Sequence, residues 1–366
     1  MRLSTFSALL AVSFAGSIAR PLALCSFVSL SLCSACQTVA PVDIGLADAT
    51  REAMSADEAV PVDAFVVDTA QQEMPQDIVL EGADPGTPHV LSYPSFVLRW
   101  PANENYAERL VLIDAGFDED TALEFGAALQ QLVWAAKPME FKTSLADGLK
   151  GDADKVELVL FTHMHHDHII GLKTLCDNGD GDDGGSSSKN APGKSPRRII
   201  GFLSESQAEL AGENANTEKG LIALREMSCV DSIRAEYEDG KFTAVDDKRF
   251  PGLYVMRTAG HTPGTQVVLA RTTQGWMLFI GDVVNAEGGY DADAEFGHPK
   301  PFLYRAVLVP EDEGVLQGAR KDLRDLMNEL TIIISHDAAN ISASELKPYA
   351  NAGAQTSAHE DAPVTH

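Results

Sequence analysis

Short apolar runs separated by polar turns extend over residues 89–350, which is the pattern of a layered α/β domain. The apolar residues within 90–98 predict a strand, and the run at 109–113 predicts its hairpin partner. The run at 156–161 is apolar at nearly every position, as in a strand that is buried on both faces. We therefore expect the ordered domain to begin near residue 89.

Two stretches carry apolar residues at helical spacing. In the first, the residues spaced to share one helix face are Leu123, Leu129, Leu132, Val133 and Ala136. In the second, which spans 311–330, the stripe consists of Leu316, Ala319, Leu323, Leu326, Met327 and Leu330. We interpret the second stretch as a helix that packs this stripe against the core.

The segments outside this pattern differ in composition. Residues 37–88 are acidic and rich in Ala, Asp and Pro, with one strand-like piece at 64–67, and we predict an acidic linker there. Residues 177–198 interrupt the domain with a stretch rich in Gly, Ser and Asp, which predicts a mobile insertion because it offers little apolar surface to bury. We expect residues 351–366 to form a polar tail.

Residues 1–36 have the composition of an export signal. The apolar runs at 3–18 and 22–35 are both shorter than a comfortable membrane span and rich in small residues. Cys36 follows a Leu-Cys-Ser-Ala run that resembles the cleavage box of bacterial lipoproteins, and cleavage after Ala40 is the competing interpretation. We expect an exported protein that is periplasmic or attached to the bacterial envelope through a lipidated Cys36.

The charge of the chain restricts its partners. The sequence has 28 Lys and Arg against 54 Asp and Glu, a formal net charge of −26 at pH 7. Such a surface repels phosphate backbones, so we expect a small-molecule partner and no nucleic acid. Beyond the export signal only Cys176 and Cys229 remain, and the sequence is compatible with either a disulfide or free thiols.

The densest group of candidate metal ligands lies in 163–168, directly after the predicted strand at 156–161. The candidate ligands in this group are His163, His165, Asp167 and His168. Imidazole nitrogens and carboxylate oxygens are ligands that zinc accepts, and a tight turn cannot satisfy four of them with backbone partners. We therefore predict a metal site, and we predict that the remaining His166 faces elsewhere.

Three further candidate ligands each follow an apolar run that reads as a strand. They are His261 after 253–256, Asp282 after 277–280 and His336 after 332–334. In layered α/β proteins the carboxyl ends of strands gather along one edge, where sites are built. The pattern therefore predicts that all seven residues contribute to one site.

The order and spacing of these residues resemble the metallo-β-lactamase superfamily. Residues 163–168 match its His-x-His-x-Asp-His motif, and the later His, Asp and His follow in the usual order, over roughly residues 89–350. The resemblance implies an α/β fold, the αββα four-layer sandwich, with the metals at one edge. It also implies that Asp114, in an Asp-Ala-Gly hairpin end, supports the site without binding metal.

The same resemblance implies how the ligands are divided between two divalent cations, Zn²⁺ or alternatively Fe or Mn. One cation takes His163, His165 and His261, and the other takes Asp167, His168 and His336. Asp282 and a hydroxide bridge the pair, and this hydroxide is the expected nucleophile. Asp167 is expected to pass a proton to the leaving group.

Within the superfamily, three segments resemble the acyl-homoserine-lactone lactonases, namely 93–94, 262–266 and 335–337. That resemblance implies opening of a lactone or a related acyl ester. One position departs, because the Tyr that this branch places three residues after the bridging Asp is Asn285 here, and Tyr290 does not stand at the matching place. A β-lactam or thioester hydrolase of the same fold and a mononuclear iron sulfur dioxygenase are the alternatives.

Overall fold

The computed structural model describes residues 42–56, 59–177, 198–209, 215–235, 240–296, 299–301 and 311–350. The predicted export signal with Cys36, nearly all of the predicted insertion, and the predicted polar tail lie outside these ranges. Within the described ranges, no helix combines the length and the apolar character that crossing a membrane requires.

Among the described residues, the larger of two β-sheets has eight strands. They are β1 (Asp63–Pro75), β2 (Pro88–Trp100), β3 (Arg109–Ile113), β4 (Glu140–Phe141), β5 (Val156–Leu160), β6 (Ile199–Ser204), β7 (Val230–Ala235) and β13 (Lys347–Pro348). Seven follow the order β13-β1-β2-β3-β5-β6-β7, and β4 pairs with β1. β2 and β3 form the predicted antiparallel pair, with Val97 opposite Leu112.

The smaller sheet has five strands. They are β8 (Thr243–Ala244), β9 (Leu253–Arg257), β10 (Gln266–Thr272), β11 (Gly275–Phe279) and β12 (Thr331–Ile333). The order is β12-β11-β10-β9-β8, and β11 and β12 run parallel, with Phe279 opposite Ile333. These two strands therefore end side by side, immediately before the segments that carry Asp282 and His336.

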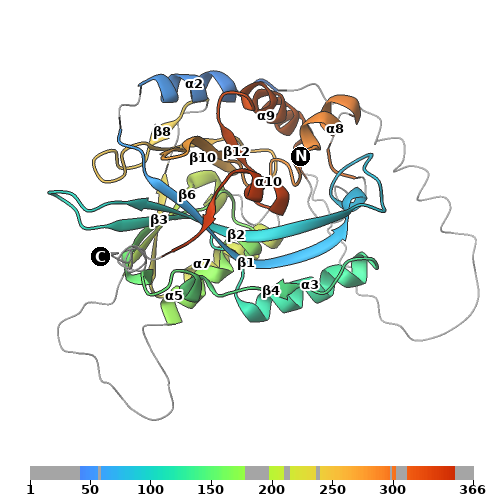
Figure 1. The fold of residues 1–366 in the computed structure, drawn as a ribbon, viewed down its shortest axis with the longest axis horizontal. Coiled ribbons are helices and arrows are strands. Elements are labelled where there is room, and N and C mark those ends of the chain that lie inside the picture. The colour runs from blue at the N-terminus through green and yellow to red at the C-terminus, as the bar shows by residue number, and fades with distance from the viewer. Residues whose placement is uncertain are drawn as a thin grey trace, which may run out of the picture. The chain divides into compact units, whose positions relative to one another are not determined.

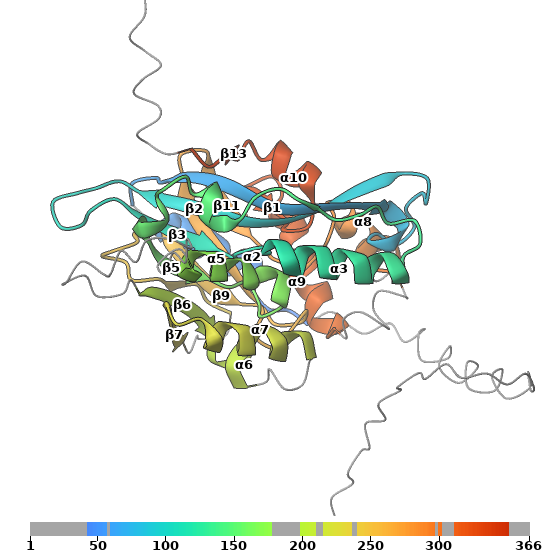
Figure 2. The ribbon, with the colours of Figure 1, turned by 90° about the horizontal axis from the view of Figure 1, so that it is seen from below.

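Helices cover the outer face of each sheet, as Figures 1 and 2 show. Over the smaller sheet lie α2 (Leu46–Ala56), α8 (Gly289–Phe296) and α9 (Glu313–Leu326). Over the larger sheet lie α3 (Glu119–Leu132), α4 (Leu145–Gly148), α5 (Lys173–Asp177) and α7 (Ala215–Glu226). Short elements complete the chain, namely η2 (Gln76–Ile78), η3 (Ala153–Lys155), η4 (His166–His168), η5 (Ile170–Leu172), α6 (Glu205–Glu209) and α10 (Ala338–Ala343). The predicted αββα layering is confirmed.

Strand β3 shows why the apolar runs of this sequence are continuous. Leu110 and Leu112 pack into the cluster between the larger sheet and its helices. Val111 and Ile113 point the other way, into the cluster between the two sheets. Because successive side chains of a strand face opposite sides, a strand that is buried on both faces needs apolar residues at every position.

The prediction of an acidic linker at 37–88 is wrong for the described part of that segment. Residues 63–75 form β1, which pairs with β2 over most of its length. Along β1, Ala64 and Val66 pack between the sheets, whereas Phe65 and Val67 pack toward the helices. The acidic composition misled the prediction because the apolar residues that reach the core are few and are interleaved with polar ones. The folded domain therefore includes α2 and β1 and does not begin at residue 89.

The apolar stripe of the second predicted helix is largely confirmed in α9. Its members Leu316, Ala319, Leu323 and Leu326 are fully buried against the smaller sheet. Asp312 caps the helix, and its side chain accepts hydrogen bonds from the backbone N–H groups of Gly314 and Val315. Met327 lies beyond the end of α9 and is 40% exposed, whereas Leu330, also beyond the helix, is partly buried against the same cluster.

The predicted face of the first helix is partly wrong. In α3 and the turn after it, Leu129, Val133 and Ala136 are buried as expected. Leu123 and Leu132 are 48% and 56% exposed, because the helix instead turns small residues toward the core. Leu132 is nevertheless used, since it lines the cavity described below.

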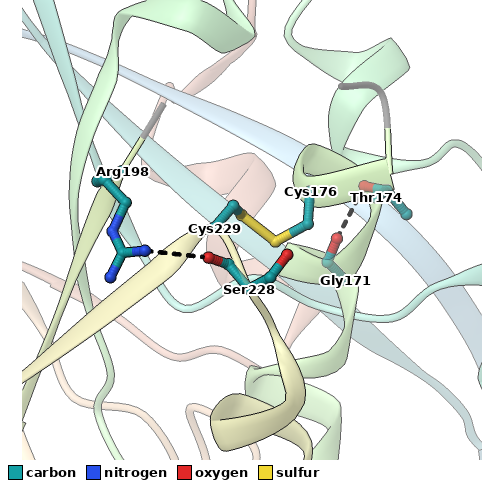
Figure 3. The surroundings of a disulfide bond; sticks show 6 residues. All are labelled: Gly171, Thr174, Cys176, Arg198, Ser228 and Cys229. Carbon is teal, nitrogen blue, oxygen red and sulfur yellow. Dashed lines mark hydrogen bonds between the residues drawn. A yellow bond between two sulfur atoms is a disulfide. The ribbon is translucent and has the colours of Figure 1, made fainter. Parts of the chain in front are cut away.

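A disulfide bond joins Cys176 of α5 to Cys229, which immediately precedes β7. Figure 3 shows the bond beside two hydrogen bonds, one from the Arg198 guanidinium to the Ser228 carbonyl and one from the Thr174 hydroxyl to the Gly171 carbonyl. The sequence left the pairing of these two thiols open. The fold brings them together because α5 lies beside the edge of the larger sheet where β7 begins.

Candidate metal centre

The seven predicted ligand residues lie together beyond the ends of four strands. The first group consists of His163, His165, His261 and Asp282, and its ligand atoms lie within 4.8 Å of one another. The second group consists of Asp167, His168 and His336 and meets the same limit. The segments that carry them follow β5, β9, β11 and β12. The four strand ends therefore converge, as the sequence predicted.

Asp282 lies between the two groups and directs one carboxylate oxygen at each. Its Oδ1 is 3.3 Å from Nε2 of His168 and 3.2 Å from Nε2 of His336. Its Oδ2 is 3.5 Å from Nε2 of His261 and 3.8 Å from Nε2 of His163. One carboxylate thus faces histidine nitrogens of both groups.

Four of the five histidines have an outer partner that fixes which ring nitrogen faces the site. The Nδ1 atoms of these rings face Thr162 Oγ1 for His163 (3.1 Å), Asp114 Oδ2 for His168 (2.8 Å), Glu311 Oε1 for His261 (2.6 Å) and the Ser92 carbonyl for His336 (2.8 Å). Nε2 of each ring then faces inward. His165 instead presents Nδ1, which lies 3.2 Å from Nε2 of His261. Outer partners of this kind orient metal-binding histidines and set their tautomers.

The turn at the end of β3 connects the strand to the motif. Asp114 has a positive φ of 56°, and its carboxylate accepts hydrogen bonds from both the backbone N–H and the hydroxyl of Thr162 at 2.8 Å. Gly116 follows with φ of 65°, and a Cβ there would lie 2.3 Å from the Thr69 hydroxyl oxygen and 2.6 Å from the Tyr93 carbonyl oxygen. Only glycine fits this position, which explains the Asp-Ala-Gly sequence.

The residues of the site fit divalent cations. Within the described part of the chain, Nε2 of His163 and Oδ1 of Asp282 are buried and have no hydrogen-bond partner. Buried polar atoms are normally satisfied, so two orphaned ones that line the same site indicate that the site binds a ligand. Imidazole nitrogens with carboxylate oxygens, and no thiolate, are a donor set for Zn²⁺ and for Fe or Mn.

Electrostatic coupling divides the two groups. Burial, together with the neighbouring His261, lowers the pKa of His165 to about 3. Burial also acts to lower the pKa of His336, but the carboxylates of Asp282 and Asp167 outweigh it and raise that pKa to about 10. The pKa of His168 is likewise raised, because Asp114, Asp282 and Asp167 together outweigh its burial. The second group therefore has a negative field that favours positive charge, whether from protons or from a cation.

A cavity of about 230 Å³ opens onto the site. Its polar side includes Asp167, Asp282 and His336, whereas apolar side chains such as Met74 and Leu91 form much of its wall. Part of that wall comes from η2 and the end of β1, the segment that the sequence had suggested was a linker. The cavity therefore brings an apolar surface directly against the candidate metal ligands.

Tyr93 of β2 lies in the wall closest to the second group. Its side chain is 3% exposed, and its ring centroid is 5.0 Å from that of His336 in an edge-on arrangement. Burial raises the pKa of the Tyr93 hydroxyl well above its ordinary value, and Asp167 and Asp282 add to the effect. A hydroxyl that stays protonated beside two carboxylates can serve as a hydrogen-bond donor in the cavity.

Three residues that the sequence analysis singled out have distinct positions. His166 belongs to neither ligand group, but it lines the cavity and so does not face entirely away from it. Asn285 also lines the cavity, and its buried Oδ1 has no hydrogen-bond partner within the described residues. Tyr290 is 2% exposed and lines a different cavity, so it does not take the place of the expected Tyr at position 285.

Sequence reasoning missed two residues that contact the ligands. Glu311 and Lys300 lie beside His261 and Asp282. No apolar periodicity or motif spacing marks either of them. The only local signal is that Glu311 directly precedes Asp312, the capping residue of α9.

Comparisons with known proteins agree with this geometry. The model of the metallo-beta-lactamase superfamily matches residues 95–344. The solved structures include an N-acyl homoserine lactone hydrolase with the product N-hexanoyl-L-homoserine bound at its catalytic metal center, at 17% identity and TM-score 0.52, covering 79% of this chain and 99% of that one. An AiiA variant of B. thuringiensis with N-decanoyl-L-homoserine at its active site gives 16% identity and TM-score 0.52, with coverages of 79% and 99%. No curated protein matches the chain.

At these identities, the likeness to solved structures concerns the fold. The family match covers most of the chain, from within β2 to the end of α10, and includes all seven candidate ligands. The chain belongs to the metallo-β-lactamase superfamily.

Proposed function

We propose that the protein is a metal-dependent hydrolase that opens a lactone or a related acyl ester at a pair of divalent cations. The observation that carries this proposal is the position of Asp282, whose two carboxylate oxygens face the two ligand groups. The site lies against a cavity with extensive apolar walls, which suits the acyl part of a neutral substrate.

Each residue of the site has a role in this proposal. His163, His165 and His261 would hold one cation, and Asp167, His168 and His336 would hold the other. Asp282, whose two carboxylate oxygens face both sets of histidines, would be shared between them. When bound, such a pair polarises the scissile carbonyl and lowers the pKa of water toward neutrality, so that a nucleophile is available. Asp167 lines the cavity, where its carboxylate can take a proton from the attacking water and pass it to the leaving alkoxide. The Tyr93 hydroxyl donates a hydrogen bond to the substrate from the cavity wall beside His336.

Charge favours an acyl ester over a phosphodiester. Among the described residues that line the cavity, Lys219 is the only Lys or Arg, and the whole chain has a formal net charge of −26. A polyanion approaches such a surface against repulsion, whereas a neutral lactone does not. Solved proteins with the same fold that were crystallised as N-acyl homoserine lactone hydrolases add support for the lactone.

We further propose that the protein works outside the cytoplasm, in the periplasm or attached to the envelope through a lipidated Cys36. The support within the domain is the bond between Cys176 and Cys229, because disulfides form and persist in oxidising compartments. Labelling of cells with a radioactive fatty acid, followed by purification, tests the anchor. A Cys36→Ser protein that retains the label would contradict it.

Turnover and metal content, measured on the same preparation, test the proposed function. We expect about two divalent cations per chain after zinc supplementation, and hydrolysis of at least one substrate in a panel of acyl lactones, β-lactams and thioesters. Asp282→Ala should remove nearly all of this activity, because it removes the shared ligand.

The same experiment separates the alternatives. A content of one cation or fewer after supplementation, together with oxygen consumption on a persulfide, would instead indicate the mononuclear iron sulfur dioxygenase. A rate on a generic phosphodiester above the rate on every acyl substrate would overturn the assignment to acyl esters.

A further inference from the structure

A buried ion pair lies directly behind His261. The carboxylate Oε1 of Glu311 is 2.6 Å from Nδ1 of His261 and 2.6 Å from Nζ of Lys300. The side chains of Glu311 and Lys300 are each only 1% exposed. Lys300 also donates a hydrogen bond to the main-chain carbonyl of Asp282 at 3.0 Å. The pair therefore contacts two of the candidate ligand residues, which come from different strand ends.

A main-chain hydrogen bond also connects the segment of Glu311 to the turn that carries His261. The N–H of Asp312 donates to the carbonyl of Gly260 at 2.8 Å, which joins the start of α9 to the turn that carries His261. Oε1 of Glu311 accepts a hydrogen bond from the Lys300 ammonium, and the same oxygen lies 2.6 Å from Nδ1 of His261, which is the geometry of an Nδ1–H that donates to a carboxylate.

Stability alone does not account for such a pair. Two apolar side chains of similar volume would serve packing equally well or better, because the desolvation of two buried charges offsets most of their attraction. A function that needs a negative charge at this point explains its presence more directly. Carboxylates that receive the outer N–H of a metal-binding histidine raise the basicity of the ring and fix its orientation.

We propose that Glu311 and Lys300 are a positioning pair for the metal centre, a role that rests on the proposed metal-dependent function. Glu311 keeps the proton of His261 on Nδ1, so that Nε2 is the atom that faces Oδ2 of Asp282 at 3.5 Å and Nδ1 of His165 at 3.2 Å. Lys300 holds Glu311 in place and anchors the main chain of Asp282. The pair thereby sets the relative position of a ligand used by one cation and a ligand shared by both.

The tautomer of His261 tests the proposal in the wild-type protein without metal. Long-range ¹H–¹⁵N spectra of the cation-free protein at neutral pH, assigned with a His261→Gln variant, report which ring nitrogen carries the proton. We expect the proton on Nδ1. A proton on Nε2 would overturn the proposal, and this measurement does not depend on activity or on any variant of the pair.

A double variant tests the consequence for metal binding. Glu311→Leu with Lys300→Met removes both charges at similar volume, so neither partner is left buried alone. We expect zinc affinity, measured by chelator competition, to fall by about 10- to 100-fold, while the melting temperature of the cation-free protein changes little. The His261 proton should become distributed over both nitrogens.

The matched control is a second ion pair at α9, between residues that belong to neither candidate ligand group. Arg320 is fully buried and bonds Glu313 at 2.8 Å. Glu313→Leu with Arg320→Met should leave both the zinc affinity and the His261 tautomer unchanged.

The proposal would be overturned if the Glu311 and Lys300 double variant kept the zinc affinity and the His261 tautomer of the wild-type protein. If that variant does not fold, the His261 tautomer measured in the wild-type protein decides the question. Failure of the wild-type protein to bind zinc would count against the proposed function, while the tautomer would still test the pair.

Discussion

Oδ2 of Asp114 lies 2.8 Å from Nδ1 of His168, and both side chains are almost completely buried. The same carboxylate accepts two hydrogen bonds from Thr162, at the start of the motif. Asp114 therefore orients the second ligand group from outside, although it lies at the end of a different strand. Its left-handed backbone conformation is the local cost of that position.

We predict that Asp114→Asn weakens binding at the second group. The variant removes the charge that faces His168 and replaces one acceptor by an amide N–H, so affinity for one of two cations should fall by about 10- to 100-fold. Chelator competition that resolves two binding steps measures this loss. Asp325→Asn, at an exposed position of α9, is the control and should change neither step. Unchanged affinity at both steps in Asp114→Asn would show that the contact has no role in binding.

We predict opposite outcomes for two adjacent histidines. His165→Ala should remove nearly all hydrolysis, because Nδ1 of His165 belongs to the first ligand group. His166→Ala should leave most of it, since His166 contributes no ligand atom, although a change in KM is expected because its side chain lines the cavity. The two variants are compared by their kcat and KM from steady-state kinetics, with the metal content of each preparation measured alongside. Equal losses of kcat would mean that the motif is assigned in the wrong register.

We predict that the disulfide contributes substantially to the free energy of unfolding. Cys176 and Cys229 are 53 residues apart in the sequence. Closing a loop of that length lowers the entropy of the unfolded chain, which raises the free energy of unfolding by about 2–4 kcal/mol. Cys176→Ser with Cys229→Ser should lower the midpoint of guanidinium unfolding accordingly. Wild-type protein unfolded in the presence of a reductant is the internal control and should match the variant. Identical midpoints for oxidised and reduced wild type would contradict the prediction.

We predict that cation binding releases protons from the second group. The pKa of His336 is raised to about 10 and that of His168 is also raised, so both rings are charged near neutral pH when no cation is bound. A bound cation needs the neutral rings, so on the order of two protons should leave. Deprotonation is favoured as the pH rises, so zinc affinity should increase from about pH 7 to about pH 9 and be lost as the pH falls.

A pH indicator in weakly buffered solution measures the release when zinc is added to the cation-free protein. His336→Ala should release about one proton fewer, because one of the two charged rings is gone. A release close to zero in the wild type would show that the rings are already neutral and that the carboxylates do not hold protons on them.

The sequence by itself determined the set of candidate ligands. His163 to His168 follow a continuous apolar run, and His261, Asp282 and His336 each follow another, so each ligand is marked by its own neighbours in the chain. The apolar stripe of α9 was also predictable, since helical periodicity is local. Information of this kind lies within a few residues and does not depend on what the segment packs against.

Only the tertiary structure decided which distant residues complete the site. The sequence predicts a linker where β1 lies, because the core contacts of β1, such as Phe65 opposite Val97, depend on pairing with β2 and on burial of both faces. Leu132 lines the cavity although its helical face was expected in the core, and Glu311 reaches His261 across 50 positions of the chain. Such contacts arise when layers pack against each other, and no short window of sequence contains both partners. The electrostatic field at His336 has the same origin, because it depends on carboxylates brought in by β5 and β11.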